Sequence, residues 1–70
     1  MQTIEFNIEG DYIELNKLLK ASGVCSTGGE AKMLIEIGEV RVNGVVERRK
    51  RRKINRGDVI SLFDYNITVN

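Results

Sequence analysis

The chain has 70 residues, 41% apolar and 30% charged, with a formal net charge of +1, which predicts one globular domain over residues 1–70 and excludes a disordered tail. One cysteine, Cys25, and no histidine exclude an internal disulfide framework and the usual kind of zinc site, and leave that thiol without an activating imidazole. The longest apolar run is Met33 to Ile35, so we expect no membrane span and no signal peptide, and the single cysteine fits a reducing, cytoplasmic location.

The first predicted element is a strand over residues 4–8. Ile4, Phe6 and Ile8 alternate with polar residues, which is the period of a half-buried strand. Gly10 ends this pattern. We therefore expect the side chain of Phe6 to lie in the core.

Two short helices follow, each with the signals of a helix start and end. The first is predicted to begin at an N-cap Asp11, with Glu14 at the spacing of a capping box, and to close at Gly23. The second has Thr27 as its N-cap and Glu30 three residues later. The residues at the buried helical spacing are Leu15, Leu18, Leu19, Ala31, Leu34 and Ile35.

After Gly38, where the second helix is predicted to stop, the apolar period changes from 3.6 to 2. Val40 and Val42 alternate with charged residues, and Asn43–Gly44 is a strong hairpin signal because both turn positions need positive φ. Residues 45–46 are the predicted return strand.

Two more strands complete the chain. Gly57–Asp58 predicts a turn, residues 59–63 a strand with Phe63 pointing inward, residues 64–66 a tight connection, and residues 67–69 the last strand. The order is β-α-α-β-β-β-β. This predicts an α+β fold in which two small helices pack on a short, curled, mainly antiparallel sheet.

The charge is unevenly distributed. Residues 1–40 carry three cations and seven carboxylates, a net charge of −4, whereas residues 41–58 carry eight cations and two carboxylates, a net charge of +6. Such asymmetry favours a polyanionic partner.

Six consecutive cations form the centre of the positive half: Arg48, Arg49, Lys50, Arg51, Arg52 and Lys53. Because like charges repel one another unless an anion compensates, we expect an exposed loop or an irregular edge strand. The guanidinium groups would be free to bind nucleic-acid phosphates. A solvated loop, a nuclear-localisation tag and a docking site for an acidic protein are the alternatives.

The start of the second helix is a second candidate site. Gly28 and Gly29 are poor helix formers, and without side chains there a phosphate or ribose could approach the free N–H groups, with Lys32 adding a charge. The alternative is that these glycines let the turn pack tightly against the first helix. Glu30 opposes an anion site unless its carboxylate is occupied in the capping box.

Arg41 is a third candidate, on the polar face of the first hairpin strand. The aromatic residues Phe6, Tyr12, Phe63 and Tyr65 form no interleaved stacking array in the sequence, so single-strand recognition is not indicated. The pattern favours shape and backbone recognition of structured RNA or of a duplex.

Four motifs between Tyr12 and Ile60 resemble the alpha-L RNA-binding domain, first defined in the fourth ribosomal protein of the small subunit. They are Asn16-Lys17-Leu18-Leu19, Gly29-Glu30-Ala31-Lys32, Gly38-x-Val40-x-Val42-Asn43-Gly44 and Gly57-Asp58-x-Ile60. The resemblance implies a small, stand-alone, cytoplasmic bacterial protein that binds structured RNA, with ribosomal RNA as the expected target.

The resemblance also implies an RNA-facing surface on the start of the second helix and the adjacent strand and loop. The matching positions are Thr27, Gly28, Gly29, Lys32 and Arg41. Family members commonly carry arginine, aspartate and arginine where this chain has Glu14, Asn16 and Gly28, and the dense run at 48–53 would supply the missing charge.

The sequence therefore predicts a monomeric, non-catalytic RNA-binding protein without cofactor, metal, membrane or small-molecule substrate. A protein-interaction module and a DNA-binding protein remain alternatives, because phosphate contacts do not distinguish the sugar. An enzyme remains possible only if the chain belongs to a larger RNA-modifying protein, since its own residues supply no base, nucleophile or metal site.

Overall fold

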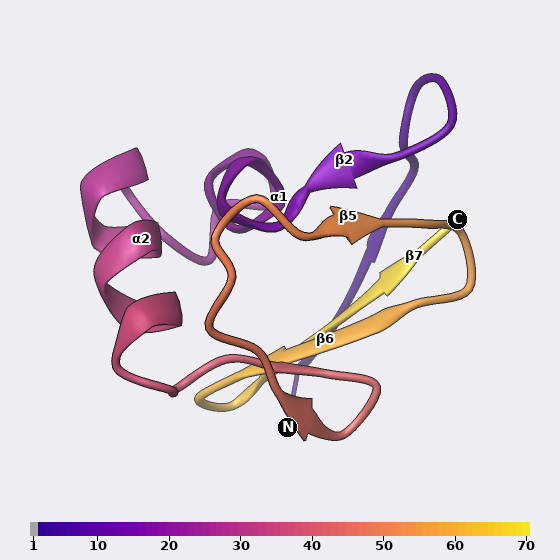
Figure 1. Cartoon of the computed structure of the whole chain (residues 1–70). Coiled ribbons are helices and arrows are strands. Elements are labelled where there is room, and N and C mark those ends of the chain that lie inside the picture. The colour runs from indigo at the N-terminus through magenta and orange to yellow at the C-terminus, as the bar shows by residue number, and fades with distance from the viewer. Residues whose placement is uncertain (1) are drawn as a thin grey trace.

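The computed structural model describes residues 2–70 and, over these residues, contains two helices and seven strands (Figure 1). In chain order they are β1 (Gln2–Phe6), β2 (Ile13–Glu14), α1 (Leu15–Ala21), α2 (Gly28–Glu36), β3 (Arg41–Val42), β4 (Val45–Val46), β5 (Lys53–Ile54), β6 (Val59–Leu62) and β7 (Tyr65–Val69). Both helices lie on one side of the larger sheet. The predicted α+β fold is confirmed.

The strands form two sheets. The larger sheet has the order β1-β7-β6-β3-β4, in which β1 and β7 are parallel and the other neighbours are antiparallel. In the smaller sheet β2 and β5 are antiparallel, with Ile13 opposite Ile54. The sequence does not predict this smaller sheet, because strands of two residues are too short to show an alternating pattern.

One cluster of buried apolar side chains joins the helices to the larger sheet. The register aligns Val42, Ile60 and Ile67 in one buried row across β3, β6 and β7. The helices contribute Leu15, Leu18, Leu19, Ala31, Leu34 and Ile35. Since successive strand residues point to opposite faces, Arg41 and Ser61 lie on the face away from the helices.

The start of α1 differs from the prediction. The helix begins at Leu15 with Glu14 as its N-cap residue, so the N-cap predicted at Asp11 is wrong. The Glu14 side chain makes no capping hydrogen bond; instead the backbone N–H groups of Leu15 and Asn16 donate to carbonyl oxygens of residues 50–52. Carbonyls from a distant part of the chain replace the side-chain cap.

The start of α2 and the ends of both helices follow local signals. Thr27 Oγ1 accepts a hydrogen bond from the backbone N–H of Glu30 at 3.1 Å, as predicted. The Glu30 carboxylate accepts from the backbone N–H of Ser26 at 3.0 Å, so the capping box is displaced by one residue. Gly23 and Gly38 end the helices with φ values of 83° and 86°.

The β3–β4 hairpin turns at Asn43 and Gly44, whose φ values of 52° and 84° confirm the predicted turn. The Asn43 side chain ties this turn to β6. Its Nδ2 donates to Asp58 Oδ1 at 3.0 Å, and its Oδ1 accepts from the backbone N–H of Val59 at 2.9 Å. The side chain of Asn43, at the tip of the hairpin, therefore fixes that tip to the start of β6.

The turn between β6 and β7 is also displaced from its predicted place. β6 ends at Leu62 and β7 begins at Tyr65, so Phe63 and Asp64 form the connection, not residues 64–66. Phe63 has φ +54° and is 61% exposed, so its predicted core position is wrong. Leu62 takes the last inward position of β6, and the next residue turns outward. Phe6, by contrast, is partly buried against the core as predicted.

Candidate nucleic-acid interface

The basic segment, residues 48–53, leads from β4 into β5 and passes the start of α1 (Figure 1). Its backbone is tied down at three points. The carbonyls of Lys50 and Arg52 accept from the first two N–H groups of α1 at 3.0 and 2.9 Å, and Lys53 pairs with Glu14 in the smaller sheet. A segment expected to be a loop or an edge strand is thus a loop with a short strand at its end, attached to a helix.

Glu47 compensates two of the six cations. Its Oε1 lies 2.9 Å from Arg49 Nη2 and 3.2 Å from Arg52 Nε, and its Oε2 accepts from Arg49 Nε at 3.0 Å and the Arg49 backbone N–H at 3.1 Å. The side chain of Glu47 is only 13% exposed. The side-chain hydrogen bonding of Arg49 lowers the pKa of Glu47 to about 2, against the opposing effect of burial. The carboxylate is therefore ionised at neutral pH.

Lys50 and Arg51 occupy the centre of a turn. The backbone N–H of Arg52 donates to the carbonyl of Arg49 at 3.2 Å, which closes a four-residue turn with Lys50 and Arg51 at its two central positions. Both side chains are exposed, and neither has an ion-pair or hydrogen-bond partner within residues 2–70. These are the cations of the segment most available to an external anion.

The two cations at the ends of the segment make contacts of another kind. The guanidinium of Arg48 packs on Gly38, where a β-carbon would come within 2.8 Å of Arg48 Nη2. The ammonium of Lys53 lies 4.9 Å from the centre of the Tyr12 ring, a cation–π distance. Both cations remain exposed, but each contacts a residue from a distant part of the chain, Gly38 after α2 and Tyr12 before β2.

The start of α2 is open, unlike the basic segment. A β-carbon on Gly28 would meet no atom within 4 Å, and one on Gly29 would meet only Thr27 Oγ1, at 4.0 Å. Tight packing against α1, the alternative left by the sequence, is therefore wrong. Within the described chain, no group accepts from the N–H groups of Gly28 and Gly29. Lys32 is exposed one turn later, and the Glu30 carboxylate is occupied by Ser26.

The structure brings Arg41 close to the basic segment but separates the start of α2 from it. Arg41 is exposed and lies opposite Val46 in the β3–β4 pair, and Val46 is two residues before Arg48 in the chain. Arg48 packs at the other end of α2, beside Gly38, and nine helical residues place the first turn about 12 Å away along the axis. The predicted site thus consists of two patches.

The S4 domain, as a protein family, matches residues 6–70 of this chain. The chain belongs to the S4 domain family. A solution structure of Escherichia coli YbcJ, described as revealing an alpha-L motif involved in RNA binding, superposes with a TM-score of 0.69 at 38% identity, covering 99% of this chain and 86% of that one. The resemblance to the alpha-L RNA-binding domain is confirmed.

Two curated relatives agree with this assignment. "Putative RNA-binding protein YbcJ" of Escherichia coli (strain K12) is 41% identical over 58 residues, which are 83% of each chain. "Probable ribosome maturation protein RlbA" of Bacillus subtilis (strain 168) is 36% identical over 56 residues, 80% of this chain and 79% of that protein.

Sequence reasoning missed two features of this S4 domain. The first is the role of Glu47, which directly precedes the basic segment. Its position two residues before Arg49 could have indicated that ion pair, but its contact with Arg52 depends on the turn between them. The contact of Lys53 with Tyr12 depends on the β2–β5 pairing, for which the sequence shows no pattern.

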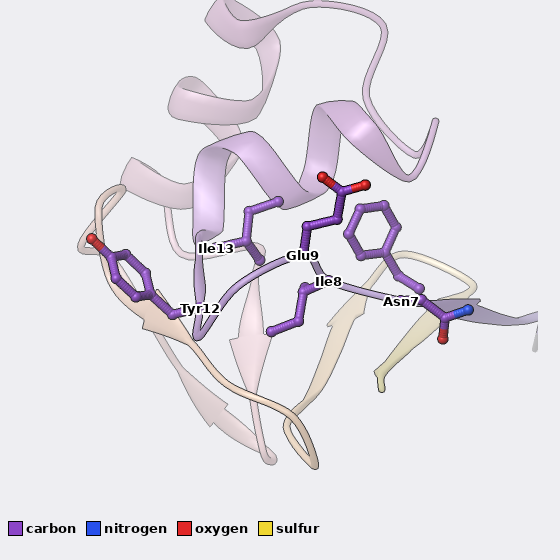
Figure 2. Close-up of a pocket in the computed structure, with 6 residues that line it drawn as sticks. Asn7, Ile8, Glu9, Tyr12 and Ile13 are labelled. Atoms are coloured by element: carbon purple, nitrogen blue, oxygen red, sulfur yellow. The ribbon is translucent and has the colours of Figure 1, made fainter.

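A cavity of about 300 Å³ lies beside β2, lined by Phe6, Asn7, Ile8, Glu9, Tyr12 and Ile13. Figure 2 shows Ile8 and Ile13 near its middle and Tyr12 to one side, while Asn7 turns its amide away. The titratable side chains of the lining are the Glu9 carboxylate and the Tyr12 phenol, and Figure 2 shows Tyr12 at the side of the cavity away from Glu9. The cavity therefore offers a mixed polar and apolar surface, with its two titratable side chains set apart.

Other kinds of site find little support in residues 2–70. No group of three or more histidine, cysteine, aspartate or glutamate residues there is placed to hold a metal ion. Cys25 is buried, and burial followed by the nearby Glu30 carboxylate raises the pKa of its thiol, which disfavours the reactive thiolate. Within the same residues, no helix is long and apolar enough to cross a membrane.

Proposed function

We propose that this chain is a non-catalytic RNA-binding protein that holds a structured RNA, with ribosomal RNA as the target, mainly through phosphate contacts. The observation that carries the proposal is the basic segment, whose backbone is attached to α1 while Lys50 and Arg51 stay exposed and unpaired among the described residues. Membership of the S4 family, the RNA-binding description of YbcJ and the ribosome maturation description of RlbA support the same class of partner.

Phosphates are the ligands that suit this surface best. Arginine and lysine bind phosphate oxygens with charge-assisted hydrogen bonds, and Arg41 and Arg48 extend the positive surface beyond the turn. Because the backbone of the basic segment is already ordered, RNA binding has less conformational entropy to remove. At the start of α2, the free N–H groups of Gly28 and Gly29 would donate hydrogen bonds to the oxygens of a second phosphate or of a ribose.

A structured RNA suits the surface better than a single strand. Tyr12 and Phe63 are exposed aromatic residues, but Tyr12 lies just before β2 and Phe63 in the turn between β6 and β7, and Lys53 covers one face of the Tyr12 ring. Recognition of single strands relies on successive bases stacked on aromatic side chains. An RNA stem is recognised mainly by its shape, phosphates and 2′-hydroxyls, which this surface can contact.

The test compares two double variants with the same loss of charge. Lys50→Ala with Arg51→Ala is expected to weaken binding to a labelled RNA hairpin at least about tenfold in fluorescence anisotropy, about equally for unrelated sequences. Lys17→Ala with Lys20→Ala removes two exposed cations of α1 and is expected to change binding much less. Equal losses in the two double variants, or a strongly sequence-selective loss, would contradict a phosphate site at the turn.

Crosslinking in cells identifies the target. Reads concentrated on one structured region of ribosomal RNA, and lost when Lys50 and Arg51 are replaced, would support the ribosomal target. Reads spread over other transcripts would replace that target while keeping RNA binding. Tighter binding to a DNA duplex than to an RNA duplex of the same sequence would favour the DNA-binding alternative. Purification with an acidic protein, free of RNA, would favour the protein-docking alternative.

A further inference from the structure

The turn in the basic segment has a carboxylate at its base. Arg49 and Arg52 are the first and last residues of the turn, and both bind Glu47. Its Oε1 lies 2.9 Å from Arg49 Nη2 and 3.2 Å from Arg52 Nε, and its Oε2 accepts from Arg49 Nε at 3.0 Å. The same carboxylate accepts the backbone N–H of Arg49. One side chain thus holds both corners of the turn while the two central cations face outward.

This arrangement divides the cations by role. The four consecutive cations of the turn, residues 49–52, repel one another. The largely buried carboxylate of Glu47 reduces that repulsion by pairing with Arg49 and Arg52, without contacting Lys50 or Arg51. Arginine suits the corners because its planar fork donates from two nitrogens at once, as Arg49 does to Glu47. The corner arginines therefore shape the turn rather than extend its binding surface.

We propose that Glu47 is a positioning residue of the RNA site: by holding Arg49 and Arg52 together, it presents Lys50 and Arg51 as an ordered pair to the phosphates of a structured RNA. The inference rests on the proposed function and deepens it. Charge alone predicts the opposite role, since a carboxylate among cations repels phosphate and its removal would tighten binding.

Removing the Glu47 carboxylate is expected to weaken RNA binding if Glu47 positions the turn, and to tighten it if charge alone matters, so the two can be told apart directly. Glu47→Gln and Glu39→Gln each remove one negative charge, but Glu39 is exposed and makes no ion pair within the described residues. Each side chain that must be ordered on binding weakens affinity by about two- to tenfold. We therefore expect Glu47→Gln to bind an RNA hairpin about fivefold or more weakly than the wild type. Glu39→Gln is expected to bind as well as the wild type or slightly better.

A second variant keeps the net charge constant. Arg49→Lys with Arg52→Lys preserves every positive charge of the segment but removes the guanidinium contacts with Glu47, the fork of Arg49 and the single contact of Arg52 Nε. Since the two central cations are untouched, a site governed by charge alone predicts unchanged affinity. The positioning role predicts weaker binding to the hairpin, with a smaller preference for the hairpin over an unstructured oligouridine.

Anisotropy titrations with both RNAs, and thermal melts of each variant, complete the experiment. Weaker hairpin binding by Glu47→Gln and by the double lysine variant, in proteins that melt as cooperatively as the wild type, supports the proposal. Affinity of Glu47→Gln equal to or above that of Glu39→Gln overturns it, as does an unchanged double lysine variant. If the wild type itself binds neither RNA, the proposed function has failed, which is a result distinct from these.

Discussion

The basic segment and the start of α2 are the two regions predicted to contact RNA, and the structure makes them opposites. In the basic segment most groups are engaged: carbonyls accept from α1, and Glu47 holds Arg49 and Arg52. At the start of α2, the first two residues are glycines with open space around them and unpaired N–H groups.

The difference shows that charge density and availability are separate properties. Of the six cations in the basic segment, only Lys50 and Arg51 lack a neighbour that places them among residues 2–70. The start of α2 has little charge but presents donors that nothing in the described chain uses. The first region is suited to strong, salt-sensitive attraction, and the second to close, short-range contact.

The largest effect expected from this comparison is a dependence on salt. Neutralising about four to six phosphates predicts a log–log slope of about −3 to −5, so raising salt from about 50 to about 200 mM weakens RNA binding by about two to three orders of magnitude. Anisotropy titrations over this range measure the slope. The Lys50→Ala, Arg51→Ala variant is expected to have a shallower slope by about two. A wild-type slope near zero would remove the basic segment from the site.

A smaller effect is expected at the start of α2. Gly28→Ala with Gly29→Ala replaces poor helix formers in open space. The free energy of unfolding is therefore expected to rise by less than about 1 kcal/mol per residue, and the melting temperature with it. RNA binding is expected to weaken about three- to tenfold because the methyl groups block close approach, with the salt slope unchanged. Met33→Ala, on the exposed side of the same helix, is the control for both measurements. Unchanged binding in the more stable variant would remove α2 from the site.

The smallest effect concerns stability in acid. The pKa of Glu47 is lowered from 4.5 to about 2, so its contribution to stability is complete above about pH 4.5 and is lost as the pH falls toward 2. For Asp58, burial acts in the opposite direction, but hydrogen bonds from Asn55 and Asn43 lower the pKa and add to the same trend. Denaturant unfolding followed by circular dichroism should show a shallower loss between pH 4.5 and 2 for Glu47→Gln than for Glu39→Gln. Identical acid profiles would contradict the pairing of Glu47.

Local signals predicted the elements whose partners are near in sequence. The Thr27 cap, the Asn43–Gly44 turn and the glycine ends of both helices needed only a few neighbouring residues to form, and all are confirmed. The predicted N-cap of α1 was wrong because the partners of its first N–H groups are distant in the sequence. Asp11 and Glu14 have the spacing of a capping box, but carbonyls more than thirty residues away satisfy the same N–H groups.

The candidate site divides in the same way. The positive charge of residues 41–58, the two glycines at 28–29 and the family resemblance can all be read along the chain. The availability of each cation cannot, because it depends on the fold of the turn that brings Arg52 to Glu47 and on the strand pair that brings Lys53 to Tyr12.

The sequence by itself determined the α+β pattern, the helix caps at Thr27 and Gly38, the hairpin turn and the location of the positive charge, since these follow from composition and from residues within one turn of each other. Only the tertiary structure decided how the basic segment is held and which of its cations remain free. The physical reason is that hydrogen bonds and ion pairs require distances of about 3 Å between groups, and chain folding alone brings α1, β2 and the basic segment that close.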